Sequence, residues 1–372
     1  MNKPKIVETK NVLLFSPENP FEFECGVRLP QVRVAYETYG HLNQAGDNAI
    51  FVCHALTGSA HAAFYNTPND KIPGWWHGFI GYDCPLDPEK YFIVCANLLS
   101  SCYGTTGPDS TDPATGKPFK MTFPPTTTRD MVRVNKALLD YLGVKRLACV
   151  TGGSLGGMQV WEWLVQYPEF VEKAIPIAGT AKGSPWMIAL NEVARQAIYN
   201  DPNWQNGNYE QNPPNAGLHL ARMIGMISYR SQQQFWERYA RDRVDNSPEN
   251  YFNFENWFQI ESYLHYQGEK LVQRFDARTL VYLSKAMDLH DISRGFESYE
   301  AALARIQARI LILGISSDVL YFPDELKRLT DDLIKSGKNA RYEEINSIFG
   351  HDAFLIEYAK MNPLVAAFLA EK

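Results

Sequence analysis

A serine set among glycines is the residue of this chain whose surroundings best suit nucleophilic chemistry. Residues 152–156 read Gly-Gly-Ser-Leu-Gly, so Ser154 stands in a Gly-x-Ser-x-Gly pattern. An apolar run at residues 147–150 predicts a strand before it, and residues 158–164 predict a helix after it. A sharp strand-to-helix turn leaves room only for small residues beside the serine and exposes its hydroxyl above a helix N-terminus. The pattern indicates a nucleophile, although the same five letters also occur in ordinary glycine-rich loops.

A serine nucleophile needs a base, and the base needs an acid that orients it. A strand-to-helix turn of this kind is called a nucleophile elbow. In proteins that have one, the three residues follow along the chain in the order Ser, then Asp or Glu, then His. Asp318 lies just beyond a predicted strand at residues 310–314, and His351 follows an alternating stretch at residues 342–345. Both would lie at the carboxyl ends of strands, where the active sites of α/β folds gather. We therefore predict Ser154, Asp318 and His351 as a catalytic triad.

Both partners of the serine have competing interpretations. Asp318 could be a turn or capping residue for a helix that begins at Pro323. His290, in the sequence Asp-Leu-His-Asp, is a rival base. We favour His351 over His290 because Gly350 frees the backbone beside His351, whereas His290 does not follow a predicted strand of the sheet.

Acyl transfer through a serine also requires two preorganised N–H groups for the oxyanion. One is expected from the amide of Leu155, directly after the nucleophile. The other should come from the loop after an early strand, where residues 53–58 read Cys-His-Ala-Leu-Thr-Gly, and we assign it to the amide of Leu56. The competing interpretation is an ordinary glycine-containing loop. Cys53 is not expected to be the nucleophile, because it lies within the strand pattern and no elbow follows it.

The elements that would position these residues alternate between strands and helices. Residues 32–39 alternate in period two and end at Gly40, which is typical of an antiparallel edge strand. Apolar runs at 49–53 and 91–96 predict buried parallel strands, and apolar residues spaced by three and four predict a helix over 128–142. This rhythm, with the elbow, predicts an α/β class protein with the α/β-hydrolase fold, a mostly parallel doubly wound sheet.

A long segment without a strand pattern divides this sheet. A strand is predicted at residues 173–179, and the parallel-sheet pattern resumes at residues 308–314. The aromatic-rich amphipathic stretch between them, of roughly 110 residues, is what a helical lid over an active site would look like. We predict a core domain of residues 1–182 and 297–372 and a helical lid domain of residues 183–296.

Charge and composition argue against several classes of function. A formal net charge of −6 argues against binding nucleic acid through a basic face. The six cysteines form no Cys-x-x-Cys pair, so we expect neither structural zinc nor a disulfide framework. No apolar run approaches the roughly 18 residues of a membrane span, and no apolar segment of a secretory signal follows the first residues. We expect a cytoplasmic protein that acts on small molecules, without a metal or a permanently bound cofactor.

Beyond the elbow, longer motifs resemble those of the homoserine O-acetyltransferases, enzymes of methionine biosynthesis with the α/β-hydrolase fold. The similarity covers residues 30–368 or nearly so. The matching stretches are His-Ala-Leu-Thr-Gly-Ser at 54–59, Trp-Trp-His-Gly-Phe-Ile-Gly at 75–81, Gly-Thr-Thr-Gly-Pro at 104–108, Gly-Gly-Ser-Leu-Gly-Gly-Met-Gln at 152–159, Ala-Arg-Met-Ile-Gly-Met-Ile-Ser-Tyr-Arg at 221–230 and Gly-His-Asp at 350–352. The resemblance implies the same triad of Ser154, Asp318 and His351.

The resemblance further implies how substrates are bound. Arg222 matches the residue that binds the carboxylate of the amino acid, which a planar guanidinium suits, and Asp352 matches the one that binds the α-ammonium group. Without the resemblance we would favour a surface salt bridge for Arg222 and a loop cap for Asp352. It also implies acetyl-CoA as co-substrate, an acetyl-Ser154 intermediate and a homodimer that associates through the lid. No glycine-rich phosphate loop marks a coenzyme A site, so we expect a tunnel.

Three other activities fit parts of this pattern. A relative of the same family could use succinyl-CoA, or L-serine as acceptor, because one or two pocket residues can decide either choice. A carboxylesterase would share the triad but would not need the pair of Arg222 and Asp352. A binding protein without catalysis would be expected to lose one triad residue, and all three are present.

Overall fold

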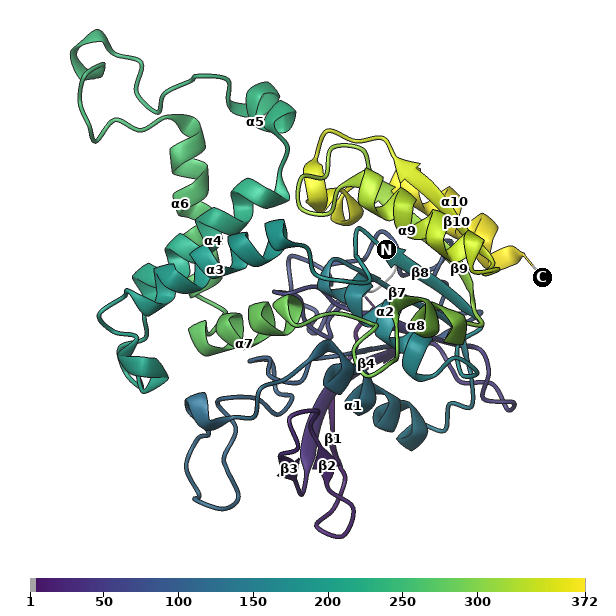
Figure 1. Ribbon diagram of the computed structural model, residues 1–372. Helices are drawn as coiled ribbons and strands as arrows, with labels where there is room; N and C mark the ends of the chain where they lie inside the picture. Colours follow the sequence, from purple (N-terminus) through teal and green to yellow (C-terminus); the bar gives the residue numbers. More distant parts are fainter. Residues whose placement is uncertain (1–4, 372) are drawn as a thin grey trace.

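A mixed eight-stranded sheet forms the centre of the computed structural model, which describes residues 5–371 (Figure 1). The strand order is β1-β4-β6-β5-β7-β8-β9-β10, and β2 and β3 form a separate pair. The strands are β1 Lys10–Leu14, β2 Phe21–Glu22, β3 Arg28–Leu29, β4 Val32–Tyr39, β5 Ala49–Cys53, β6 Phe92–Ala96, β7 Leu147–Gly153, β8 Lys173–Ile177, β9 Arg309–Ile315 and β10 Ala340–Ile345. The expected α/β class and its mostly parallel sheet are confirmed.

Strand β4 is antiparallel, as predicted, but it does not lie at the edge. It pairs with β6 on one side and with β1 on the other, so β1 is the edge strand. The prediction of an edge strand at residues 32–39 was wrong because β1 carries almost no strand signal. Of its five residues only Leu14 is buried, so the sequence shows no apolar alternation there.

Helices cover both faces of the parallel strands. The helices of the described chain are α1 Thr128–Tyr141, α2 Leu155–Gln166, α3 Pro185–Tyr199, α4 Asn215–Tyr229, α5 Gln232–Tyr239, α6 Gln259–Val272, α7 Ala277–Asp288, α8 Tyr299–Arg305, α9 Pro323–Lys335 and α10 Tyr358–Ala370. Helix α2 packs against β5, β7 and β8, whereas α10 packs against β10. Neighbouring residues of β5 enter different clusters, Phe51 one and Ile50 the other, as the period-two alternation of a strand requires.

Helices α3 to α7 occupy the segment between β8 and β9 that the sequence predicted to be helical. In Figure 1 helices α3 to α6 stand away from the sheet on the left and at the top, with the connection between α5 and α6 farthest out. The two ends of this segment, hereafter the helical insertion (residues 183–296), are pinned to each other. Gly183 N donates to His290 O at 2.9 Å, and Ile292 N donates to Ala181 O at 3.1 Å.

The described residues contain neither a membrane-spanning helix nor a metal-binding cluster. Within residues 5–371, no helix is long and apolar enough to cross a membrane. In the same range, no three His, Cys, Asp or Glu side chains are grouped so that they could hold a metal ion.

Candidate active site

The turn that carries Ser154 has the strained backbone expected of a nucleophile elbow. Ser154 has φ 60° and ψ −125°, a conformation that residues other than glycine rarely adopt, and it caps the N-terminus of α2. A Cβ atom on Gly152 or Gly156 would stand 2.5 Å or 2.1 Å from the carbonyl oxygen of Cys53. The glycines are therefore required because the elbow lies directly against the end of β5.

The carboxyl ends of β9 and β10 bring Asp318 and His351 together. The Nδ1–H of His351 donates to Asp318 Oδ2 at 2.8 Å, and both side chains are buried. The other oxygen, Asp318 Oδ1, accepts from the amides of Leu320 and Tyr321 at 2.8 and 3.0 Å. The carboxylate is thus fixed by its own loop while it orients the imidazole.

The imidazole is set up to act as a base through its second nitrogen. Burial lowers the pKa of His351, but the charge and hydrogen bond of Asp318, with a further contribution from Asp352, raise it, and the net result is a raised pKa. With Nδ1 donating to Asp318, Nε2 carries the lone pair. Nε2 is buried, and no residue in the described part of the chain hydrogen-bonds to it.

Tyr321 connects these two side chains to the serine. Its ring centroid lies 5.2 Å from that of His351, and Ser154 is close enough to its hydroxyl to affect the pKa of the phenol. The pKa of Tyr321 is raised, first by burial and then by the charge of Asp318, while the contact with Ser154 lowers it. Ser154, Asp318 and His351 therefore converge around one buried tyrosine.

His290, the rival base, forms hydrogen bonds within the protein and does not face the serine pocket. Its Nε2 is 3.0 Å from the carbonyl of Thr180, and its Nδ1 is 2.9 Å from the hydroxyl of Thr128. Complete burial lowers the pKa of His290 to about 3, so its ring is neutral. Both nitrogens are already engaged, and His290 is absent from the side chains that line the pocket over Ser154.

Leu56 and Leu155 lie on the two sides of the serine. Leu155 is the first residue of α2, and Leu56 lines the same pocket as Ser154. In the part of the chain that the structure describes, neither backbone amide donates to a protein acceptor. Two unsatisfied N–H groups beside a nucleophile are what an oxyanion requires.

A buried histidine holds the loop that carries Leu56. The side chain of His54 accepts from the amide of Leu98 at 3.2 Å through Nε2, and its Nδ1–H donates to Ala55 O at 2.8 Å. Burial lowers the pKa of His54 to about 4, which keeps the ring neutral for these two bonds. The side chain of Gln159 on α2 donates to His54 O at 3.3 Å and ties the loop to the elbow helix.

The pocket over Ser154 lies between the elbow and the helical insertion. Most of its lining is apolar, and the polar side chains are Ser154, Asn191, Ser228, Tyr229 and Ser284. Asn191 is held by Asp288 Oδ1 at 2.9 Å. The pocket can therefore shield a reaction at the serine from water.

Arg222 and Asp352 both lie near Tyr229, which lines this pocket. Burial raises the pKa of Tyr229, the charge of Arg222 lowers it and that of Asp352 raises it, so both charges act on this phenol. The guanidinium carbon of Arg222 lies 5.6 Å from the Tyr229 ring, whose centroid is 6.0 Å from that of His351. The structure thus brings both predicted substrate-binding residues close to the predicted triad.

Tyr229, Tyr321 and His54 were not predicted as site residues. Tyr229 follows Arg222 by seven residues, about two helical turns, so its place on the same face of α4 could have been inferred. His54 and Tyr321 stand next to the predicted oxyanion loop and acid, but only long-range contacts show what they do.

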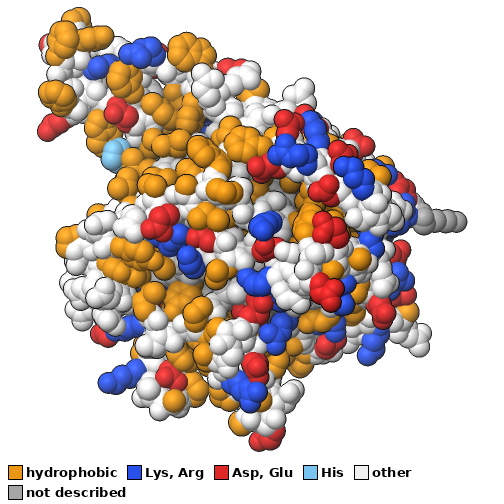
Figure 2. Space-filling model, viewed as in Figure 1, with side chains coloured by type: hydrophobic (Ala, Val, Ile, Leu, Met, Phe, Trp, Pro, Cys, Tyr) orange, Lys and Arg blue, Asp and Glu red, His pale blue; other side chains and the backbone are white. Residues whose placement is uncertain are grey.

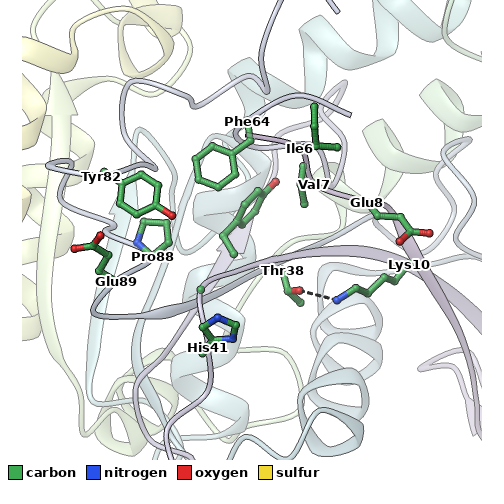
Figure 3. A pocket seen from close by; sticks show the side chains of 12 residues that line it. Ile6, Val7, Glu8, Lys10, Thr38, His41, Phe64, Tyr82, Pro88 and Glu89 are labelled. Carbon is green, nitrogen blue, oxygen red and sulfur yellow. Dashed lines mark hydrogen bonds between the residues drawn. The ribbon is translucent and has the colours of Figure 1, made fainter. Parts of the chain in front are cut away.

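A wider hollow lies beside β1 and β4 (Figure 3). It is lined by Phe64, Tyr82, Lys10 and other residues, and Lys10 hydrogen-bonds to Thr38 there. None of the predicted site residues faces it. Its lining offers no nucleophile with a base, so the candidate site remains the pocket over Ser154.

Comparisons with known proteins identify the family and the fold. Residues 48–357 match the family described as alpha/beta hydrolase fold. A homoserine O-acetyltransferase of Moorella thermoacetica is 51% identical over 349 residues, which cover 94% of this chain and 93% of the relative. The crystal structure of homoserine O-acetyltransferase from Bacillus anthracis superposes with a TM-score of 0.92 at 32% identity and 99% coverage of both chains. Esterase E22 superposes with a TM-score of 0.89 at 29% identity, covering 98% of this chain and 100% of its own.

Proposed function

This chain belongs to the homoserine O-acetyltransferases of the α/β-hydrolase fold, and we propose that it transfers an acetyl group from acetyl-CoA to the side-chain hydroxyl of L-homoserine. The reaction proceeds in two steps through an acetyl-Ser154 intermediate. Its products are free coenzyme A and O-acetyl-L-homoserine, a reaction of methionine biosynthesis.

In the first step Ser154 becomes acetylated. Nε2 of His351 takes the hydroxyl proton as Oγ attacks the thioester carbonyl, and the amides of Leu56 and Leu155 stabilise the oxyanion. When the C–S bond breaks, His351 returns the proton to the sulfur, and coenzyme A leaves as a thiol. Asp318 stabilises the imidazolium while it exists.

In the second step homoserine takes the place of coenzyme A. Nε2 of His351 removes the proton of the homoserine hydroxyl, whose oxygen attacks the acetyl carbonyl. The oxyanion uses the same two amides, and the proton passes to Oγ of Ser154 as the product leaves. Transfer competes with hydrolysis, so the apolar lining of the pocket supports the proposal by excluding water.

The observation that most supports an amino acid as acceptor is the guanidinium of Arg222, which has no ion-pair partner among the described residues. Among residues 5–371, no carboxylate forms an ion pair with Arg222, and its Nε is buried without a hydrogen-bond partner. A partly buried cation without a counter-charge is costly unless a ligand provides one. The carboxylate of an amino acid would do so, with Asp352 available for its ammonium group, whereas a neutral ester needs neither residue.

The lining of the pocket favours an acetyl group over a succinyl group. Its described side chains include no lysine or arginine that could pair with the distal carboxylate of a succinyl group. Leu190, Ala194, Ile224 and Met287 would leave that charge without a partner. We place coenzyme A in a tunnel that leads to Ser154, with no permanently bound cofactor.

The direct test is release of free thiol from acetyl-CoA and succinyl-CoA with homoserine, L-serine or water as acceptor, with the product identified by mass. Homoserine-dependent release from acetyl-CoA and a product carrying one acetyl group would support the proposal. Ser154→Ala should lower turnover by at least about 10³-fold. Release independent of an acceptor would identify an esterase, and a preference for succinyl-CoA or serine would replace the substrate while keeping the mechanism.

We further propose that residues 183–296 form a lid domain on a core of residues 1–182 and 297–372, and that two copies associate through it. Figure 2 shows hydrophobic side chains gathered over the helical insertion at the upper left. The exposed hydrophobic side chains of residues 183–296 include Leu220, Ile227, Trp236 and Tyr266, each about half exposed or more, and Phe252, which is 88% exposed. An exposed apolar surface is typical of an interface between proteins.

A further inference from the structure

The bend between α4 and α5 lies directly against the loop that carries His351 and Asp352. Ser231, which caps α5 by accepting from Gln234 N at 3.0 Å, donates its hydroxyl to Ile348 O. Gly350 has φ +67°, and a Cβ atom there would stand 2.7 Å from backbone atoms of Arg230 and Ser231. The helical insertion therefore packs backbone to backbone on the histidine loop.

Arg230 adds an ion pair to this contact. Its Nη2 lies 3.1 Å from Oδ2 of Asp352, and both side chains are mostly buried, with exposed fractions of 16% and 15%. Among the described residues, Arg230 is the only one that pairs with the carboxylate of Asp352, so Oδ1 has no partner. By contrast, Arg222, which lies within α4, has no carboxylate partner within residues 5–371.

We propose that Arg230 is a positioning residue for the acceptor: it holds the carboxylate of Asp352 in the orientation that receives the α-ammonium group of the amino acid. This inference rests on the proposed function. A carboxylate on a loop can rotate about its side-chain bonds, and a single ion pair to Oδ2 fixes it while leaving Oδ1 free. The helical insertion thus sets the geometry of a group that belongs to the core.

The two half-reactions should respond differently to the loss of Arg230. Formation of acetyl-Ser154 needs no contact with an ammonium group, so it should be preserved. The second step needs the homoserine hydroxyl placed beside the acetyl group, and that placement depends on both ends of the amino acid. Loss of Arg230 should therefore raise the KM for homoserine.

The pH profile offers a readout that a purely structural role would not change. The negative charge of Asp352 raises the pKa of His351, and Arg230 offsets part of that charge. Without Arg230 the pKa of His351 should rise further, so the acid limb of kcat/KM should move to higher pH. The titratable and charged groups around the imidazole are Asp318 and Tyr321 from the connection after β9, Arg222 and Tyr229 from α4, Arg230 from the bend and Asp352 from its own loop.

The experiment compares Arg230→Met and Arg230→Lys with the wild-type enzyme and with Arg146→Met. Arg146 forms a surface ion pair with Glu172 at 3.6 Å, so its variant controls for the loss of an ion-paired arginine away from the site. For Arg230→Met we expect a rise of about tenfold or more in the homoserine KM, as for loss of a charged hydrogen bond. The burst of thiol released from acetyl-CoA without acceptor should keep its wild-type rate, and Arg230→Lys should recover part of the KM.

Three results would overturn the inference while the wild-type enzyme remains active with homoserine. The first is an Arg230→Met variant whose homoserine KM and acid limb of kcat/KM are both unchanged. The second is an Arg230→Met variant that loses the same factor in the rate of the thiol burst and in the rate of the second step. The third is an Arg230→Lys variant whose homoserine KM is no lower than that of Arg230→Met. A wild-type enzyme without homoserine-dependent turnover would instead contradict the proposed function. Melting temperatures of all variants separate a loss of folding from each of these results.

Discussion

Two arginines within one stretch of chain show how the surroundings of a residue set its role. Arg222 and Arg230 flank Tyr229, yet Arg230 is ion-paired to Asp352 and Arg222 has no carboxylate partner among the described residues. The first is satisfied within the protein, and the second can accept an anionic group from solution. Two arginines eight residues apart thus serve opposite ends of the proposed substrate: Arg222 would bind its carboxylate, and Arg230 would orient Asp352 for its ammonium group.

Arg222→Ala should weaken homoserine binding strongly while sparing the acylation of Ser154. The loss of a charged contact in a mostly buried site corresponds to a rise of about 30-fold or more in the homoserine KM. The measurement is a steady-state titration of homoserine together with the thiol burst from acetyl-CoA. Arg238→Ala is a matched control on α5, because the contacts of Arg238 are with the rings of Tyr239 and Tyr263. Equal losses in both half-reactions would show that Arg222 does not act on the acceptor.

The sequence placed Ser154, Asp318 and His351 at the ends of strands, and the structure brings them together around Tyr321. Their local patterns predicted this neighbourhood because the chain order and the strand ends define where such residues meet. The ion pair between Arg230 and Asp352 could not be inferred, since it joins residues more than a hundred positions apart. Tyr321 and His54 were missed for the same reason.

At the scale of elements, the close approach of α2 to the end of β5 determines the geometry of the proposed oxyanion site. Leu155 belongs to α2, and Leu56 follows β5, so the distance between their amides depends on how closely these two elements pack. The glycines of the elbow allow that approach. The strand and helix patterns predicted both elements, whereas the missing alternation of β1 concealed the true edge of the sheet.

Gly156→Ala should separate these two elements. Its Cβ would stand 2.1 Å from the carbonyl oxygen of Cys53, so the helix or the strand end must shift. We expect a loss of about 1–3 kcal/mol of stability from overpacking and a larger relative loss of kcat, because the two amides move apart. Calorimetry and the rate of the thiol burst measure the two effects. Gly81→Ala, where the nearest atom would be Cys84 Sγ at 3.5 Å, is the control; if both variants behaved alike, the packing argument would be wrong.

At the scale of the whole molecule, buried ionisable groups connect stability to pH. His54 and His290 are both fully buried and neutral, with each pKa lowered, to about 4 and about 3. Glu162, beside His290, has its pKa raised to about 7 by burial. The histidines therefore destabilise the folded state in acid, and the glutamate acts in the opposite direction.

The free energy of unfolding should fall as the pH drops below about 6.5. Below that pH His54 and His290 take up protons in the unfolded chain but not in the folded one. Each therefore lowers the free energy of unfolding by about 1.4 kcal/mol per pH unit. Glu162 contributes stability that is complete below pH 4.5 and is lost as the pH rises towards 7. Between these pH values its effect on the free energy of unfolding offsets that of one of the two histidines. Urea unfolding at pH 7.5, 5.5 and 4.5 tests this, and His290→Gln should flatten the acid slope. An acid slope equal to that of the wild-type protein would contradict the assignment of a neutral His290.

The apolar surface of the helical insertion should hold two copies of the chain together. Leu220→Glu combined with Ile227→Glu places two charges on exposed apolar positions of α4 and should convert a dimer into a monomer. Sedimentation velocity measures the change, with Leu13→Glu on the exposed edge strand β1 as the control. A wild-type protein that sediments as a monomer, or a double variant that stays dimeric, would rule out this interface.

The helical insertion leaves and rejoins the core at one point, where residues 181–183 pair with residues 290–292. Ends that are already adjacent can be joined by a short linker with a small entropic cost, so the segment is a transferable module. Exchanging it between relatives at these two positions would retain the acylating machinery, since Ser154, Asp318 and His351 all remain in the recipient. Three of the proposed acceptor contacts, Arg222, Tyr229 and Arg230, would travel with the graft, whereas Asp352 would remain in the recipient. A family built in this way can vary its acceptors by recombination at the place where residues 181–183 pair with residues 290–292.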